Sequence, residues 1–181
     1  MKNKNNKSGE KMQSKNLIER TVRNLVETAI VNLGYELWDI EYYNDGIEWL
    51  LEITIENPSG ISISIDDCEK VTHAVNPIID EADPIENSYS LAVSSPGLNR
   101  ELKNNFHLNR YLGKEVTVKL FAKNEIIGDK TFHAALKEIN ETDKNFVFEL
   151  LPGNAGNPDN PTVVFTKKEV AHIYAHDEID I

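Results

Sequence analysis

The feature that most constrains the fold is a run of alternating apolar and polar residues that follows an Asp-Gly turn. From Ile47 to Glu56, apolar side chains take every second position and mostly acidic side chains lie between them. This period of two predicts a strand with one buried face and one acidic, solvated face. Residues 36–43 predict a second strand, and the Asp45-Gly46 pair between the two is a strong hairpin signal.

Segments with helical periodicity precede and follow this hairpin. Residues 16–33 carry apolar side chains three and four positions apart, and Gly34 provides a C-terminal stop. Ser64 is placed to cap a second helix, with Asp67 completing a capping box. Pro77 is expected to kink or end this helix early, because proline removes a helix hydrogen bond. The buried stripe of the second helix is expected to consist of Cys68, Val71, Ala74, Val75, Ile78 and Ile79.

The remaining N-terminal segments complete one domain. Residues 88–93 alternate and predict a third strand, so the order is α-β-β-α-β. This order predicts a two-layer α/β sandwich over residues 16–96, with the helices on one face of a small sheet. Residues 1–15 carry five lysines and one glutamate without apolar periodicity, and they are expected to form a disordered basic tail.

After Gly97 the pattern changes to a short helix and closely spaced strands. The helix is predicted at 106–112, capped by Asn104 or Asn105 and ended by Gly113. Strands are predicted at 115–121, 130–139, 146–150, 162–165 and 171–175. Residues 97–181 are therefore expected to form a small five-stranded β-barrel, which makes the whole chain an α+β protein of two domains.

Composition excludes several classes of protein. With 40% hydrophobic and 27% charged residues, the chain has an ordinary globular composition. No apolar run approaches the roughly 20 residues that cross a bilayer, and no leader is expected before the first helix, so no membrane partner is expected. The single cysteine, Cys68, excludes an internal disulfide and suits the reducing cytoplasm.

The net charge of −11 is unevenly distributed along the chain. Residues 36–86 hold 14 acidic residues and one basic residue, whereas residues 97–123 hold six basic and two acidic residues. The acidic half is a poor surface for RNA, because like charges repel phosphate. It could face a basic partner such as a ribosomal protein, or it could be a solvated face that keeps the protein soluble.

Two adjacent serines, Ser94 and Ser95, are the candidates for a nucleophile. A hydrolase elbow requires G-x-S-x-G and a phosphate-binding loop requires G-x-x-x-x-G-K, and the sequence has neither pattern here. The Pro96-Gly97 pair suits the central positions of a type II turn, where glycine supplies a positive φ. A turn between two domains therefore explains the segment better than an active site, and no enzymatic activity is expected.

Histidines provide a second candidate for chemistry. His172 and His176 lie four residues apart, and on a strand this spacing is about 13 Å, too far to share one metal ion. His73 and His107 are interpreted as surface residues of helices. Neither a metal site nor a cofactor is expected.

Basic residues follow the turn and alternate with aromatic residues. The basic residues are Arg100, Lys103, Arg110, Lys114 and Lys119, and the aromatic residues are Phe106, Tyr111 and Phe121. This combination is typical of surfaces that hold RNA. The alternative is that the aromatic residues belong to the core and the basic residues solubilise an edge strand.

One block of sequence carries a family resemblance. The segment V-S-S-P-G-L-N-R at 93–100, with the pattern that follows it at 106–120 and L-G-Y-E-L at 33–37, resembles the ribosome maturation factor RimP family over about residues 16–150. Asn99 stands where that family usually has aspartate, and Glu101 where it usually has proline. These departures concern the surface of the second domain.

The resemblance implies both a fold and a function. It implies an N-terminal α/β domain followed by an SH3/Sm-like barrel, without enzymatic activity or cofactor. It also implies a cytoplasmic factor that binds the free, immature small (30S) ribosomal subunit, including rRNA and a basic small-subunit protein, and promotes its maturation. The protein is expected to be a monomer.

Eight residues are the candidates for ribosome binding: Ser94, Ser95, Gly97, Arg100, Lys103, Arg110, Lys114 and Lys119. Of these, Arg100 is expected to reach a partner, so that Arg100→Glu would weaken subunit binding without altering the fold. A free-standing Sm-like RNA-binding regulator is the alternative function. A hydrolase that uses Ser94 or Ser95 is a third hypothesis.

Overall fold

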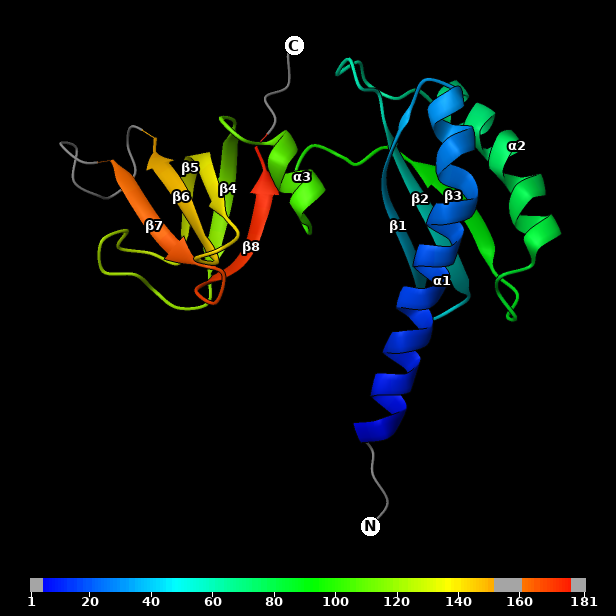
Figure 1. Ribbon diagram of the computed structural model, residues 1–181, viewed down its shortest axis with the longest axis horizontal. Coiled ribbons are helices and arrows are strands. Elements are labelled where there is room, and N and C mark those ends of the chain that lie inside the picture. The colour runs from blue at the N-terminus through cyan, green and yellow to red at the C-terminus, as the bar shows by residue number, and fades with distance from the viewer. Residues whose placement is uncertain (1–4, 152–160, 177–181) are drawn as a thin grey trace. The chain divides into compact units, whose positions relative to one another are not determined.

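A computed structural model describes residues 5–151 and 161–176, with side chains from residue 15 onward. The chain divides into two compact units, Met1–Pro96 and Gly97–Ile181, which are called unit 1 and unit 2 and are described separately (Figure 1).

Unit 1 has the predicted order of elements. They are α1 (Asn5–Asn32), β1 (Glu36–Asn44), β2 (Trp49–Glu56), α2 (Ile65–Ala82) and β3 (Ser90–Ser94). The sheet order is β1-β2-β3, in which β1 and β2 form an antiparallel hairpin and β3 pairs with β2 in parallel. A parallel pair needs a long crossover connection, which α2 supplies. Both helices cover the same face of the sheet (Figure 1), so the predicted two-layer arrangement is confirmed.

The core of unit 1 lies between this sheet and the two helices. Its fully buried side chains are Val22, Val26 and Ile30 of α1, Leu51, Ile53 and Ile55 of β2, and Val71 and Val75 of α2. Burying one such side chain contributes about 1.5–3 kcal/mol to folding. The buried stripe of α2 is narrower than predicted, because Cys68, Ala74 and Ile78 are only half-buried.

The N-terminal helix is longer than predicted. The disorder expected for residues 1–15 is wrong for residues 5–15, which belong to α1, and residues 1–4 lie outside the described residues. The missing apolar periodicity argued for disorder, but Lys, Glu, Met and Gln are good helix formers. Adding turns to an existing helix also avoids the unfavourable nucleation step.

Pro77 does not end α2, which continues to Ala82. The side chains of Pro77, Asn76 and His73 are exposed, so this side of the helix faces solvent. The carbonyl group that loses its helical hydrogen bond to the proline is therefore accessible to water, which lowers the cost of an interior proline. The Ser64–Asp67 capping box at the other end of the helix is present as predicted.

Ile47 is the one exposed apolar residue of the predicted second strand, with 92% of its surface accessible. Pairing of the hairpin stops at Asn44 and Trp49. Between them, the Asp45 carboxylate accepts hydrogen bonds from the N–H groups of Glu48 and Ile47 at 2.9 and 2.8 Å, and these bonds lower the pKa of Asp45. These hydrogen bonds to the Asp45 side chain replace the backbone pairing of a strand, so Ile47 is not part of the β1–β2 ladder.

Unit 2 contains a short helix and a single five-stranded sheet. Its elements are α3 (Asn105–Arg110), β4 (Glu115–Leu120), β5 (Thr131–Asn140), β6 (Asn145–Leu150), β7 (Thr162–Thr166) and β8 (Val170–Ala175). All neighbouring strands are antiparallel in the order β7-β6-β5-β4-β8, and each lies within one residue of its predicted bounds. Asn104 caps α3, which ends at Arg110 rather than at Leu112.

The core of unit 2 lies on one face of this sheet. Phe132 of β5 packs against Phe148 and Phe165, with ring centroids 5.7 and 5.5 Å apart. In the part of the chain that the structure describes, no ladder joins the edge strands β7 and β8. The predicted barrel is therefore supported only as a five-stranded antiparallel sheet. Residue periodicity determines the strands but not whether the two edges of a sheet meet.

Candidate functional site

The two candidate serines lie at the end of unit 1. Ser94 is the last residue of β3, and its hydroxyl group donates a hydrogen bond to Glu52 Oε1 at 2.9 Å. Tyr43 donates to Glu52 Oε2 at 3.2 Å, and the Glu52 charge raises the pKa of Tyr43. Glu52 thus joins all three strands of the sheet, which gives Ser94 a structural role. Ser95 is exposed and follows the strand.

Gly97 begins unit 2 in the conformation that the sequence predicts. Its φ of 71° lies in the left-handed region, where a glycine avoids the strain of a Cβ atom. The Gly97 carbonyl group accepts a hydrogen bond from Arg100 Nη1 at 3.2 Å. The segment that follows β3 is therefore shaped by local contacts.

Arg100 and Lys114 come together over one aromatic ring. The Arg100 guanidinium carbon and Lys114 Nζ lie 5.4 and 5.1 Å from the centroid of the buried Tyr111 ring, within the range of cation–π attraction. Arg100 is half-buried, and its carbonyl group accepts a hydrogen bond from Ala175 N–H. Arg100 therefore takes part in the packing of unit 2, so Arg100→Glu would alter more than a surface charge.

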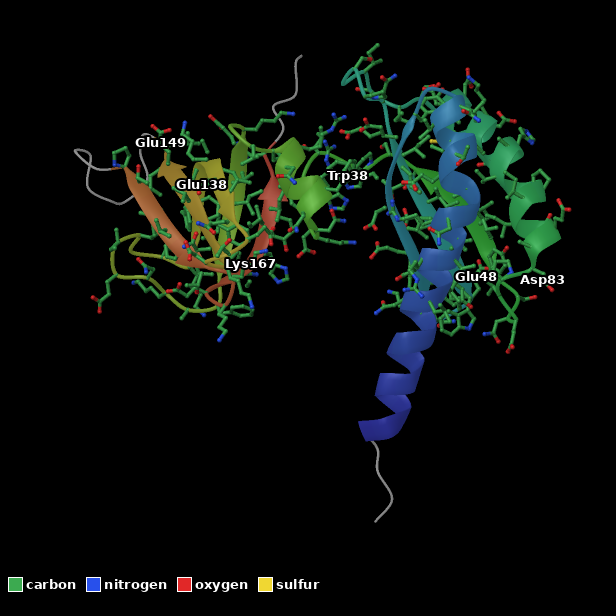
Figure 2. The ribbon with its side chains drawn as sticks, viewed as in Figure 1. Trp38, Glu48, Asp83, Glu138, Glu149 and Lys167 are labelled. Atoms are coloured by element: carbon green, nitrogen blue, oxygen red, sulfur yellow. The ribbon has the colours of Figure 1, made fainter. Side chains whose placement is uncertain are left out.

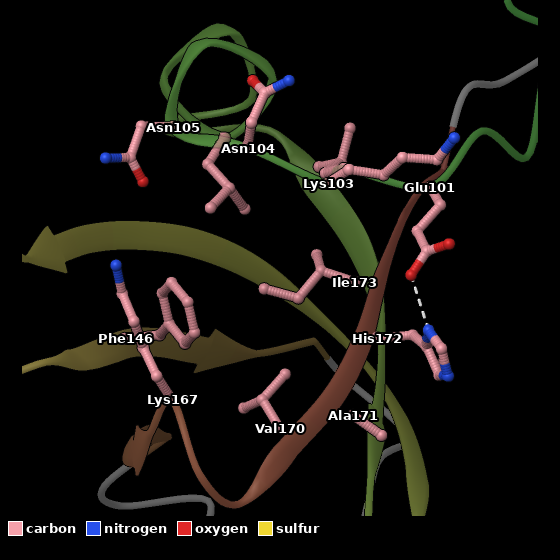
Figure 3. Close-up of a pocket in the computed structure, with 12 residues that line it drawn as sticks. Glu101, Lys103, Asn104, Asn105, Phe146, Lys167, Val170, Ala171, His172 and Ile173 are labelled. Carbon is pink, nitrogen blue, oxygen red and sulfur yellow. Dashed lines mark hydrogen bonds and ion pairs between the residues drawn. The ribbon is translucent and has the colours of Figure 1, made fainter. Parts of the chain in front are cut away.

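Lys103 lies at a pocket of about 240 Å³ in unit 2, which is called the unit 2 pocket. Lys103 and Lys167 are on opposite sides of it, and the apolar side chains of Phe146, Val170 and Ile173 lie between them (Figure 3). Asn104 and Asn105 of the α3 N-terminal segment complete one side. The pocket combines an apolar floor with two cationic groups and two carboxamides, which suits a flat polar ring or an anionic group.

Lys167 is a residue that the sequence reasoning missed. Its Nζ atom lies 5.7 Å from the centroid of the Phe146 ring and 3.3 Å from Glu141 Oε2. The sequence feature that could have pointed to Lys167 is the Lys167-Lys168 pair in the turn between the last two strands. Only the fold brings this turn next to the segment that contains Lys103.

A histidine and a glutamate connect the start of unit 2 to its last strand. His172 Nδ1 lies 2.5 Å from Glu101 Oε1, as the dashed line in Figure 3 marks. Glu101 also forms a backbone bridge with Tyr174. Glu101, one of the two departures noted in the sequence, is thus attached to β8.

Lys119 and Arg110 do not line the unit 2 pocket. Lys119 is exposed on the face of β4 opposite to the buried Val118, and it pairs in register with His172. Arg110 is half-buried in the last turn of α3. Of the candidate basic residues, Lys103 therefore lines the pocket, while Arg100 and Lys114 pack over Tyr111.

His107 is buried, so its interpretation as a surface residue is wrong. The Lys103 N–H group donates to His107 Nδ1 at 3.2 Å, and the Asn104 carboxamide oxygen accepts from His107 N–H at 2.9 Å. The helix α3 is so short that its capping contacts turn this residue toward the core. His107 is a structural residue that orients the backbone of Lys103.

The described residues contain no group of three or more His, Cys, Asp or Glu side chains that could hold a metal ion. They also contain no helix long and apolar enough to cross a membrane.

The fold and the site define a class of two-unit α+β proteins. An acidic α-β-β-α-β unit comes first, and a unit with a five-stranded antiparallel sheet follows it. Lysines line an apolar pocket in this second unit. Residues 25–99 match the family model of the RimP N-terminal domain. The resemblance to the RimP family of ribosome maturation factors noted in the sequence is therefore confirmed for this N-terminal segment. The match covers most of unit 1 and ends at Asn99, just after the turn at Gly97.

Proposed function

We propose that this protein is a non-enzymatic assembly factor that binds the free small (30S) ribosomal subunit in the cytoplasm and promotes its maturation. The observation that carries the proposal is the match of residues 25–99 to the RimP N-terminal domain. The protein acts as a monomer and without a cofactor. Its catalytic candidate, Ser94, has its hydroxyl group engaged by Glu52, which supports a role other than catalysis.

Unit 2 is proposed to be an SH3/Sm-like barrel. Five short antiparallel strands in the order β7-β6-β5-β4-β8 support this, as does the single turn at residues 167–169 that joins β7 to β8. Small barrels of this kind expose loops and strand edges to a partner, while their core is filled by side chains.

The charge distribution supports a division of labour between the units. The segment 36–86 has 14 acidic residues and one basic residue, so unit 1 would face a basic small-subunit protein. Unit 2 would contact rRNA phosphates through its exposed lysines, which include Lys103, Lys114 and Lys119. The other candidates, Ser94, Ser95, Gly97, Arg100 and Arg110, would support this surface by shaping the turn and the packing around it.

Sedimentation tests the proposed function. In a sucrose gradient of a lysate that contains the tagged protein, we expect the protein to comigrate with free small subunits and to be absent from translating ribosomes. Its absence from the small-subunit fraction would contradict the proposal.

A charge reversal tests the contribution of unit 2. Lys103→Glu is expected to weaken binding to purified small subunits and to reduce the slope of log affinity against log salt by about one. Lys130→Glu is the matched control, because Lys130 is also an exposed lysine of unit 2 but does not line the pocket. Equal effects of the two variants would show that net charge alone matters and not the place of Lys103.

An RNA-binding regulator that acts without the ribosome is the second candidate function. The observation in its favour is the pocket between Lys103 and Lys167, whose apolar floor and cations could receive a base and a phosphate. This candidate requires the isolated protein to bind free single-stranded RNA. A monomer without measurable affinity in a mobility-shift assay would exclude it.

A further inference from the structure

Unit 1 contains a second pocket, which is called the unit 1 pocket. It has a volume of about 370 Å³ and lies between α1, the β1–β2 hairpin and the segment that joins α2 to β3. Its walls include Leu17 and Ile18 of α1, Tyr42 and Trp49 of the hairpin, and Pro84 and Glu86 of the joining segment. The volume is at the lower end of ligand pockets and suits one large side chain.

Tyr42 is a wall residue of this pocket that carries an unpartnered polar atom. Its side chain is 97% buried, with 3% of its surface exposed, and its hydroxyl oxygen has no hydrogen-bond partner among the described residues. Most buried hydroxyl groups are paired, because burial without a partner is unfavourable. A ligand that brings a donor or an acceptor to the Tyr42 hydroxyl group would supply the missing partner.

The aromatic wall of the pocket consists of two stacked rings. The rings of Tyr42 and Trp49 stack with centroids 4.7 Å apart and planes inclined by 13°. The Tyr42 N–H group donates to Glu19 Oε1 at 2.8 Å, which ties β1 to α1. A fixed aromatic surface loses little conformational entropy on binding, so it favours an apolar group with a flat or bulky shape.

The charges around the pocket favour a cationic partner. Lys15, its one basic wall residue among those described, is paired with Glu19 at 3.5 Å. Glu86 is an exposed wall residue. Glu48 and Asp83 lie at the same end of unit 1 (Figure 2). The carboxylates of Glu19, Glu48, Asp83 and Glu86 thus outnumber the one cationic wall residue, Lys15, among these described residues.

We propose that the unit 1 pocket binds one large apolar side chain of a basic protein segment. The apolar side chain packs on Trp49 and Leu17, the backbone of the segment pairs with the Tyr42 hydroxyl group, and flanking Lys or Arg residues meet Glu86. Buried apolar anchors surrounded by polar contacts are the usual pattern at protein interfaces. The inference rests on the proposed meeting of unit 1 with a basic small-subunit protein and assigns the residues that would hold it.

Two short peptides test the pocket in the full chain. The first is acetyl-Lys-Lys-Phe-Lys-Lys-amide, and the second has Ala in place of Phe. We expect the Phe peptide to bind at least about tenfold more tightly in calorimetry and to shift the NMR signal of the Trp49 indole N–H group. Equal affinity for the two peptides, or shifts that leave Trp49 unchanged, would overturn the proposal.

Substitutions in the wall complete the test. Leu17→Ser is expected to weaken binding of the Phe peptide several-fold, and Tyr42→Phe to weaken it while leaving the melting temperature unchanged or higher. Ile61→Ser is the control, because Ile61 is likewise an exposed apolar residue of unit 1 but lies outside the pocket. Wild-type affinity in both wall variants would overturn the proposal.

The failure of this inference differs from the failure of the proposed function. A protein that comigrates with small subunits but does not distinguish the two peptides overturns the inference alone. A protein that binds the Phe peptide through Trp49 but does not comigrate with small subunits overturns the proposed function alone.

Discussion

The hydroxyl group of Tyr35 donates a hydrogen bond to Asp67 Oδ1 at 2.5 Å, across 32 positions of the sequence. The other carboxylate oxygen, Oδ2, accepts from the N–H and hydroxyl groups of Ser64 at 2.9 and 2.7 Å. The bond from Tyr35 is the main reason that the pKa of Asp67 falls to about 2, and the same bond raises the pKa of Tyr35. One carboxylate therefore both caps α2 and fastens it to the residue that precedes β1.

Tyr35→Phe is expected to raise the pKa of Asp67 toward its ordinary value of 3.8. Because the pKa of Asp67 is lowered in the folded protein, its ionised carboxylate stabilises the folded state. This stabilisation is complete above pH 3.8 and is lost as the pH falls through about 2. The melting temperature of the variant should be lower than that of wild type near neutral pH, and the difference should disappear in strong acid. Titration of the Asp67 carboxyl carbon by NMR measures the shift directly. An unchanged pKa would contradict the assignment of Tyr35 as its main cause.

Ser64→Ala is expected to destabilise unit 1 by about 1 kcal/mol, because it removes the oxygen that accepts from Asp67 N–H at the start of α2. Ser62→Ala is the control, because Ser62 is an exposed serine two residues earlier, outside the helix. Urea unfolding monitored by circular dichroism compares the two variants. Equal midpoints for them would show that the cap does not contribute.

Phe148→Ala is expected to destabilise unit 2 by about 3–5 kcal/mol. Phe148 is fully buried, and its ring contacts those of Phe132 and Phe165, so truncation leaves a cavity in the centre of the sheet face. Val164→Ala on the neighbouring strand β7 is the control, because Val164 is exposed. Calorimetry should show a lowered transition for Phe148→Ala and a change within about 0.5 kcal/mol for the control.

Gly113→Ala is expected to destabilise unit 2 by about 1–2 kcal/mol through backbone strain. Gly113 has a φ of 79°, and its N–H group donates to Leu136 O at 2.7 Å, which holds the turn after α3 in place. A Cβ atom would meet nothing within 4 Å, so the cost is conformational and not steric. Asn109→Ala in the exposed part of α3 is the control for unfolding measurements. A fully stable Gly113→Ala variant would show that the turn relaxes into another conformation.

The strands of this protein could be predicted closely from its sequence, because alternation, turn residues and caps are local signals. The five strands of unit 2 and the capping box of Ser64 follow from such patterns. The burial of His107 and the exposure of Ile47 could not be predicted, since each depends on hydrogen bonds that compete with the regular pattern. Closure of the second sheet depends on the distance between its edges, which no local pattern determines.

The candidate site was predictable in composition but not in arrangement. The sequence indicated that lysines and arginines gather after Gly97, and of these Lys103 lines the unit 2 pocket. Arg100 packs over Tyr111, while Lys103 shares the pocket with Lys167, a residue more than sixty positions away. Aromatic and aliphatic walls such as those of the two pockets are formed by residues distant in sequence, so a search by motif does not find them.

The parallel pairing of β2 with β3 has a consequence for the synthesis of the chain. A hairpin can form as soon as its two strands leave the ribosome, but β3 emerges only after α2 and occupies the open edge of β2. Until then, the edge of β2 in the acidic β1–β2 hairpin is unpaired, and other chains can add a strand there. The sheet of unit 1 can therefore be completed only after Ser94, the last residue of β3, has left the ribosome. The first residues of unit 2 follow directly after it.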